Sequence, residues 1–258
     1  METFEILESS CFQLGFYSQK APEKTGPNED SLGFVLHRNK AILVVADGVG
    51  GAPKGEEASQ AAVSSLVKTF SKEENLAADE HEFRHLMIDA IEKAQENIVK
   101  LNNGARSTLT ACGIHNGNLR SYQIGDSSLL VCGQKGLLKY KATEHSPTGF
   151  AVEAGLMTEL EAMSHPDRNI VSNVMGEDDM HIGIGPEIEL AEFDTILVAS
   201  DGLFDNYTTD ELIEIIRKES LQEVMQQLVT LGKQMLDPEA RKKLHKTDDL
   251  SFIVCRRK

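Results

Sequence analysis

The chain has 258 residues, with 26 Lys and Arg against 41 Asp and Glu, a formal net charge of −15 and a pI near 5.0. This acidic balance argues against nucleic acid or an anionic membrane as a partner, because those surfaces attract clustered Lys and Arg. No Pro-, Gly- or Ser-rich linker divides the sequence, so we expect a single domain over residues 1–258. No basic leader precedes a long apolar stretch, which predicts a cytoplasmic protein.

Eight short runs rich in Val, Ile, Leu and Thr are predicted β-strands, because Gly, Asn or Asp residues separate them. They cover about 31–36, 41–46, 107–114, 119–125, 128–132, 182–190, 194–200 and 249–255. Many of these runs lie close together in the sequence, as antiparallel hairpins require.

Helical periodicity appears over 54–70, 81–101 and 208–236. The third region is interrupted near Glu219, and Thr208 or Thr209 is its predicted N-cap. The helices come in pairs, one pair after the second strand and one before the last, and not between every two strands. This distribution predicts an α+β fold of antiparallel sheets covered by helices, and it disfavours a doubly wound parallel sheet.

The stretch from 143 to 181 mixes short helical patches with Gly, Pro and His. We expect it to form an irregular flap, over about 145–181, beside the functional site, because loops carry specificity more often than core strands do. His145 and His165 lie in this region, and each is expected to be a hydrogen-bonded structural histidine and not an acid catalyst.

The cysteines and the basic residues have simple interpretations. Cys11, Cys112, Cys132 and Cys255 occur singly, so we expect buried free thiols and neither zinc ligands nor disulfides. The one basic cluster, ARKKLHK at 240–246, is expected to be a solvated helix end or loop.

Acidic residues gather at the ends of apolar runs. Asp47-Gly48 closes AILVVADG and Asp201-Gly202 closes ILVASDG, whereas TDDLSFIVC carries its acids at the start. A lone Asp-Gly after a strand is typical of a turn. A carboxylate at the mouth of a buried strand is nevertheless costly unless it is hydrogen-bonded, protonated or bound to a cation. Well-separated segments contribute such acids, which are Glu29, Asp30, Asp47, Asp126, Asp201, Asp205, Asp248 and Asp249.

If these acids meet, raised pKa values or bound cations must relieve their repulsion. Oxygen ligands without nearby Cys or clustered His favour Mg²⁺ or Mn²⁺ over zinc. Gly48 has no Cβ, so we expect it to let the backbone turn sharply and present its carbonyl to a metal. Two such ions about 3.5–4 Å apart can lower the pKa of a shared water and hold it in line with a phosphorus atom. The predicted reaction class is metal-assisted phosphoester hydrolysis.

The order of these motifs resembles that of the metal-dependent serine/threonine protein phosphatases, the type 2C or PPM family, and in particular its compact bacterial branch. The resemblance runs from about residue 12 to 255 and implies a four-layer α-β-β-α sandwich, with two antiparallel sheets flanked by helix pairs. The matching segments are NEDS (28–31), VVADGVGG (44–51), STLTACGI (107–114), YQIGDSS (122–128), TEHSPTGFAVEAGLM (143–157), HPDRNIVSNVMG (165–176), LVASDGLFD (197–205) and TDDLSFIV (247–254).

The resemblance also implies residue roles. Asp47 would bridge two ions of Mn²⁺ or Mg²⁺, Gly48 would offer its carbonyl, and Asp201 and Asp248 would complete the first metal. Asp47, Asp201 and Asp248 are thus the predicted catalytic residues, and a bridging hydroxide is the implied nucleophile. The remaining acids have weaker implied roles: Glu29 and Asp30 would act through metal-bound waters or as acceptors behind them, and Asp126, Asp201 and Asp205 match a weaker third-metal site.

Several positions depart from the family pattern. Thr25 stands where the family usually carries a phosphate-gripping Arg, so Lys24 or Lys20 is the expected substitute, as a point charge without the fork of Arg. Of the two, Lys24 is our predicted substrate-binding residue. Val49 follows Asp-Gly where many eukaryotic members have a His, and it cannot protonate the leaving oxygen. Asp249 stands where Asn is common.

We therefore predict a phosphatase of phosphoserine and phosphothreonine in proteins, with a serine/threonine kinase opposing it. One alternative is a pseudophosphatase that serves as a binding or sensory module, which Thr25 in place of Arg motivates. Another is a phosphatase dedicated to one regulatory protein. The sequence shows no coiled-coil heptads, so a monomer is expected.

Overall fold

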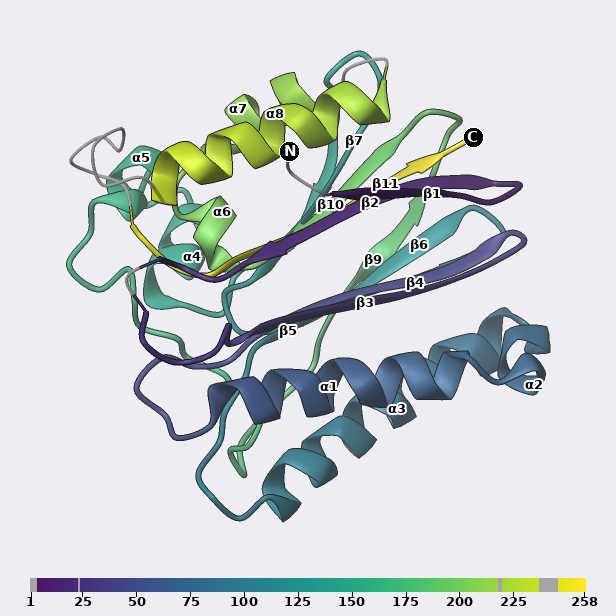
Figure 1. Cartoon of the computed structure of the whole chain (residues 1–258). Helices are drawn as coiled ribbons and strands as arrows, with labels where there is room; N and C mark the ends of the chain where they lie inside the picture. Colours follow the sequence, from purple (N-terminus) through teal and green to yellow (C-terminus); the bar gives the residue numbers. More distant parts are fainter. Residues whose placement is uncertain (1–3, 23, 218–219, 237–245) are drawn as a thin grey trace.

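The computed structural model describes residues 4–22, 24–217, 220–236 and 246–258, and these residues form four layers (Figure 1). Two antiparallel sheets lie face to face in the middle. Helices α1 (Gly55–Phe70) and α3 (Glu80–Lys100) cover one sheet, and α7 (Thr209–Ile216) and α8 (Leu221–Leu236) cover the other. The predicted α+β sandwich is confirmed.

The first sheet has six strands, and every neighbouring pair is antiparallel. Their spatial order is β1 (Glu5–Glu8), β2 (Phe12–Gln19), β11 (Leu250–Arg257), β10 (Thr195–Ala199), β7 (Ser128–Cys132) and β8 (Leu138–Lys141). Because β10 and β11 are antiparallel neighbours, the end of β10 and the start of β11 meet at one edge. This pairing brings the Asp201 and Asp248 segments together.

The second sheet has five antiparallel strands. Their spatial order is β3 (Asp30–His37), β4 (Lys40–Asp47), β5 (Leu109–His115), β6 (Asn118–Ile124) and β9 (Gly183–Glu189). β4 is buried along nearly its whole length, which accounts for its continuous apolar sequence.

Three hydrophobic clusters fill the spaces between the four layers. One contains Leu43 of β4 and Ile253 of β11 and lies between the sheets. A second joins β4 and β5 to α1 and α3, and a third joins β10 and β11 to α7 and α8. The expected stripe on α1 is fully buried, since Ala58, Ala62, Leu66 and Phe70 are each 0% exposed. Both faces of each sheet are thus packed against another layer, and polar functional groups lie at the strand ends.

Helix starts follow the expected capping chemistry. The Thr208 side chain accepts a hydrogen bond from the Glu211 amide, and the Glu211 carboxylate accepts one from the Thr208 amide in return. Asp79 and Glu82 form the same capping box at the start of α3. Thr208 is therefore the N-cap of the third helical region.

The flap contains two short helices, α4 (Pro147–Glu153) and α5 (Glu159–Met163), with turns between and after them. Its far end is tied to the second sheet, because the Met175 amide donates to the Ser107 carbonyl at 2.8 Å. The prediction of an irregular segment with short helical patches is confirmed.

The periodicity arguments missed five elements: β1, β2, β8, α2 (Glu73–Ala77) and α6 (Asp201–Phe204). Most are too short to show a period, and the FQLGFYSQ sequence of β2 interrupts its alternation with Gly15. Cys112, Cys132 and Cys255 are buried free thiols as predicted, and Cys11 is free but partly exposed. Among the helices that the structure describes, none combines the length and the apolar character that a membrane crossing requires.

The prediction for the basic cluster is wrong at one residue. Residues 240–245 lie outside the described part of the chain. Lys246, however, is not a solvated lysine: its side chain is 16% exposed and its ammonium group lies among carboxylates. The sequence does not show that Lys246, the last residue of the run, lies just before β11 and enters the acidic site. The whole run was therefore predicted to be surface charge.

Candidate metal and phosphate site

The ends of β3 and β4 bring the first two acids together. Their antiparallel register places Asp30 directly opposite Asp47. Thr108 fixes the backbone of Asp47, whose amide donates to Thr108 Oγ1 at 2.9 Å and whose carbonyl accepts from the Thr108 amide at 2.8 Å. Ser200, at the end of β10, donates its hydroxyl to Asp30 Oδ2 at 2.8 Å. This last bond joins the two sheets at the site.

Both glycines of the Asp-Gly pairs lie where another backbone passes very close. A Cβ on Gly48 would be 2.4 Å from the carbonyl carbon of Gly55, the first residue of α1. A Cβ on Gly202 would be 2.0 Å from the carbonyl oxygen of Asp249. The φ of Gly48 is not positive, so a left-handed backbone is not what requires a glycine here. Its role is to let α1 start against the end of β4.

Five of the predicted acids form one electrostatic cluster. Burial raises the pKa of Asp47 well above its usual value, and the charges of Asp30, Asp201, Asp248 and Asp126 raise it further. Burial likewise raises the pKa of Asp30 to about 7, although its hydrogen bond from the Ser200 hydroxyl acts in the opposite direction. Such shifts arise when carboxylates are desolvated beside one another. The structure thus supports the prediction that these segments converge.

Two carboxylate oxygens of this cluster lack partners. Asp30 Oδ1 and Asp201 Oδ1 are buried without a hydrogen bond from any described residue. A buried acceptor of this kind is costly unless a proton, water or cation satisfies it. The set offers only oxygen donors, which suits Mg²⁺ or Mn²⁺, so the residues present fit a divalent ion.

Asp126 and Asp205 extend the cluster on the Asp201 side. Burial raises the pKa of Asp126 well above its ordinary value, with added effects from Asp201 and Asp205. Burial also raises the pKa of Asp205, to about 7, and Asp201 adds to the effect. Lys246 opposes both shifts. Its Nζ binds Asp201 Oδ2 and lies 3.1 Å from Asp205 Oδ2 and 3.4 Å from Asp248 Oδ2.

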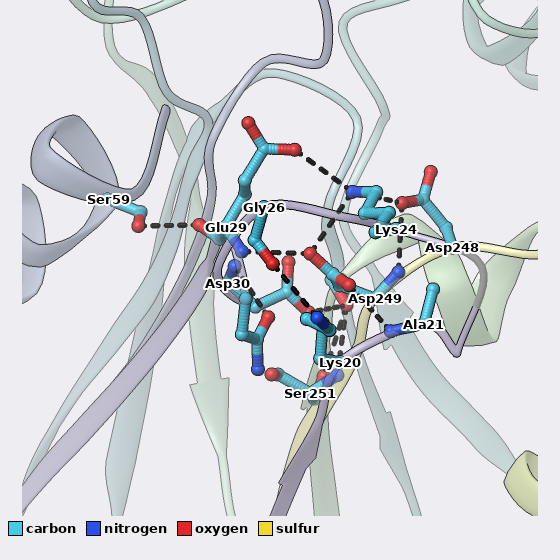
Figure 2. A network of polar contacts seen from close by, with 12 residues as sticks. Lys20, Ala21, Lys24, Gly26, Glu29, Asp30, Ser59, Asp248, Asp249 and Ser251 are labelled. Atoms are coloured by element: carbon cyan, nitrogen blue, oxygen red, sulfur yellow. Dashed lines mark hydrogen bonds and ion pairs between the residues drawn. The ribbon is translucent and has the colours of Figure 1, made fainter. Parts of the chain in front are cut away.

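Lys24 lies on the side of the site formed by Glu29, Asp248 and Asp249, as Figure 2 shows. Its Nζ lies 3.1 Å from Glu29 Oε2, 2.8 Å from Asp248 Oδ1 and 3.1 Å from Asp249 Oδ2. A lysine ammonium has three donors, and three carboxylates accept them here. Burial alone would raise the pKa of Asp248, but Lys246 and Lys24 hold it below its usual value.

Asp249 is the structural centre of this side. Its side chain is 1% exposed and accepts hydrogen bonds from the Ala21 amide at 2.7 Å and the Glu29 amide at 2.8 Å (Figure 2). With Lys24, it ties the loop before β3 to the start of β11. The sequence places Asp249 in the acid set and marks it as a departure from a family pattern, but it cannot show these backbone donors.

The carboxylates do not yet form a coordination sphere. Within the part of the chain that the structure describes, no three His, Cys, Asp or Glu side chains are arranged to hold a metal ion. The two lysine ammonium groups supply positive charge to the cluster instead.

A cavity of about 410 Å³ lies beside the acids, between the flap and the α6–α7 segment. Its lining includes Lys141, Glu144, Glu159, Phe204 and Asp205. Lys141 Nζ lies 2.9 Å from Glu159 Oε1 and 5.8 Å above the Phe204 ring, which joins the flap to the first sheet. Because Asp205 belongs to both the cavity and the acidic cluster, the cavity adjoins the site.

The flap histidines have structural roles where the contacts define them. The Asn173 side-chain amide donates to His145 Nδ1 at 2.7 Å and to the His181 carbonyl at 2.7 Å. His145 is 7% exposed, and its burial lowers the pKa of the imidazole to about 4. A neutral imidazole accepting at Nδ1 holds the flap together, as expected. His165 accepts at Nδ1 from the Asp167 amide at 3.1 Å within a turn.

Comparisons with known proteins agree with this architecture. The family model described as protein phosphatase 2C matches residues 20–247. The chain is 28% identical over 218 residues to the serine/threonine phosphatase stp of Listeria monocytogenes serotype 4b, covering 79% of this chain and 83% of the relative.

Two solved structures show the same fold. The serine/threonine phosphatase Stp1 from Staphylococcus aureus superimposes with a TM-score of 0.81 at 23% identity, covering 99% of each chain. The catalytic domain of the serine threonine protein phosphatase PstP, solved in complex with two manganese ions, superimposes with a TM-score of 0.76 at 20% identity, covering 96% of this chain and 98% of that one. The chain therefore belongs to the protein phosphatase 2C family, the metal-dependent serine/threonine protein phosphatases that its motif order resembles.

Proposed function

We propose that this phosphatase holds two divalent ions, Mn²⁺ or Mg²⁺, through Asp47, Asp201, Asp248 and the Gly48 carbonyl. The observation that carries the proposal is the meeting of Asp30, Asp47 and Asp201 at the strand ends, where Asp30 Oδ1 and Asp201 Oδ1 are buried without a hydrogen-bond partner among the described residues. When bound, divalent ions acidify water and offset the charge of a phosphoryl group.

The chain's own residues prepare the site. Thr108 holds the backbone of Asp47 through both its amide and its hydroxyl, so the carboxylate starts from a fixed position. Asp30, which Ser200 orients, and Glu29, whose amide is fixed by Asp249, serve as acceptors for ordered water beside the ions. Fixed acceptors of this kind orient water at no cost during the reaction.

Lys24 is the proposed phosphate contact. Its present partners include Asp248 at 2.8 Å, which the ions would also engage. A divalent ion held by Asp248 would weaken the attraction between that carboxylate and Lys24, and the Lys24 ammonium group could then turn toward a phosphate oxygen. Lys24 therefore acts as a point charge in the role that Thr25 leaves unfilled.

The substrate is a phosphorylated protein, and we propose that its chain beside the phosphoresidue enters the flap cavity. The cavity adjoins the acids through Asp205 and is lined by both apolar and charged side chains, as pockets for peptide side chains are. The supplier of such a substrate is a serine/threonine kinase. The proposed cellular form is a cytoplasmic monomer with one phosphatase domain over residues 1–258.

Purified protein tests the function directly. With added Mn²⁺ or Mg²⁺, we expect hydrolysis of an aryl phosphate and of phosphoserine or phosphothreonine proteins, and complete loss after chelation. Asp201→Asn should abolish turnover while the protein stays folded. Turnover that persists in chelator, or no turnover on any phosphoprotein with either ion, would overturn the proposal. Phosphate-independent binding without turnover would instead identify the pseudophosphatase that Thr25 motivated.

A further inference from the structure

Lys246 is built into the acidic site through its backbone as well as its side chain. The Lys246 amide donates to Asn206 Oδ1 at 2.9 Å, and Asn206 Nδ2 donates to the Lys246 carbonyl at 3.1 Å. Asn206 also donates to the Gly202 carbonyl at 2.9 Å. This buried asparagine therefore clamps Lys246 to the turn that carries Asp201. The backbone position of Lys246 beside the acids is thus set by the fold.

The ammonium group satisfies one oxygen of each acid in the Asp201–Asp205 pair. It binds Asp201 Oδ2 and lies 3.1 Å from Asp205 Oδ2, and the Lys246 side chain is 16% exposed. Asp201 Oδ1, by contrast, is buried and has no partner among the described residues. One oxygen of Asp201 is therefore left for an ion, whereas the other is already paired with an ammonium group.

An ammonium group and a divalent ion cannot both occupy this place. Two cations that share Asp201 Oδ2 and Asp205 Oδ2 would stand within a few ångströms of each other in a largely desolvated setting, where repulsion is strong. An ion could enter between Asp126, Asp201 and Asp205 only after Lys246 leaves. If Lys246 left, the three acids would face one another without its positive charge. The ion pairs of Lys246, whose backbone Asn206 holds in place, would also be lost.

We infer that Lys246 is the built-in counter-ion of the Asp201–Asp205 pair, and that it excludes or weakens a third divalent ion at that place. This inference rests on the proposed two-metal function and goes beyond it, because it assigns the number of tightly held ions to one lysine. The chain then works with two tight ions. Any third ion competes with an internal cation.

Metal stoichiometry tests this inference without any turnover measurement. Metal-free protein is titrated with Mn²⁺, with free Mn²⁺ counted by electron paramagnetic resonance and bound Mn²⁺ by equilibrium dialysis. We expect two tight ions in the wild type. Lys246→Met should gain one further ion, or tighten the weakest ion at least about tenfold, as changes beside metal ligands do. Lys246→Arg, which keeps the charge, should match the wild type.

Lys20→Met is the matched control, because Lys20 is only partly buried and donates to the Gly26 carbonyl at 2.9 Å instead of to a carboxylate. Asn206→Ala releases the clamp and should shift the weakest ion in the same direction as Lys246→Met, by a smaller factor. Equal stoichiometry and affinity in wild type, Lys246→Met and Asn206→Ala would overturn the inference. A wild type that binds no Mn²⁺ at all would instead overturn the proposed two-metal function. Should Lys246→Met fail to fold, Asn206→Ala alone decides the question.

Discussion

The two Asp-Gly corners of this site look alike in the sequence but are constructed differently. At the Asp47 corner, hydrogen bonds from Thr108 and the close approach of α1 fix the backbone, and no ion pair to Asp47 occurs among the described residues. At the Asp201 corner, the start of β11 packs on Gly202 and Lys246 binds the carboxylate. The Asp201 corner carries a lysine that offsets part of its charge, whereas at the Asp47 corner the proposed ions would have to supply that positive charge.

The backbone is held in place at both corners, but the balance of charge differs between them. The largest influences on Asp47, its burial and four neighbouring acids, all raise its pKa, whereas Lys246 and Lys24 hold the pKa of Asp248 low despite its burial. Carboxylates left unbalanced in a folded site cost stability, and function is the usual reason to retain them. The Asp47 corner is therefore where binding of the ions should matter most.

Asp47→Asn should have the largest effect. Activity with Mn²⁺ should fall at least about 100-fold, because a ligand shared by both ions is lost. The metal-free protein should be as stable as the wild type or more so, since one unbalanced buried charge is removed. Metal titration and thermal unfolding in chelator measure the two effects. Lost stability with retained Mn²⁺ binding would contradict the contrast between the corners.

Glycine substitutions test the two backbone contacts. Gly202→Ala and Gly48→Ala should each destabilise the fold by about 1–3 kcal/mol, because the added Cβ meets backbone atoms that cannot move away cheaply. The effect should be larger at Gly202, where the distance is 2.0 Å against 2.4 Å at Gly48. Gly50→Ala lies in the same loop as Gly48 with nothing within 4 Å, and it should be nearly neutral. Urea unfolding in chelator compares the three variants.

Lys24→Met tests the side of the site that Asp249 organises. The metal-free protein should lose about 1–3 kcal/mol, because the buried Asp249 carboxylate loses a donor. With Mn²⁺ present, KM for a phosphoprotein should rise more than kcat falls, because ground-state and transition-state phosphate contacts are lost together. Lys20→Met is the control for removing a nearby positive charge. Unchanged KM would remove Lys24 from the phosphate contact and leave it a structural role alone.

The smallest predicted effect is a pH dependence of the free energy of unfolding, which arises from His145 in the flap. The pKa of His145 is lowered from 6.5 to about 4 by burial, so the unfolded chain binds a proton there that the folded chain rejects. Stability from this group is complete above about pH 6.5 and is lost as the pH falls toward 4. Urea unfolding at pH 7 and pH 5 should show a smaller loss in His145→Gln than in the wild type. Equal losses would contradict a buried neutral His145.

The sequence by itself determined the acid set, the helix pairs and most strands, because these features depend on local periodicity and on the unusual cost of acids at buried strand ends. The order of the motifs along the chain indicated the family. Thr208 as an N-cap and the buried stripe of α1 also followed from local patterns.

Only the tertiary structure decided what each charge faces. Lys246 belongs to a basic run that the sequence predicts to be exposed, and only its contacts with Asn206 and Asp201 show its burial. Asp249 gains its role from backbone amides of Ala21 and Glu29, more than 200 residues away along the chain. The close approach of α1 to Gly48 is a further contact that the sequence does not show. Such contacts are non-local, and a sequence records which groups are present but not the partners that folding assigns to them.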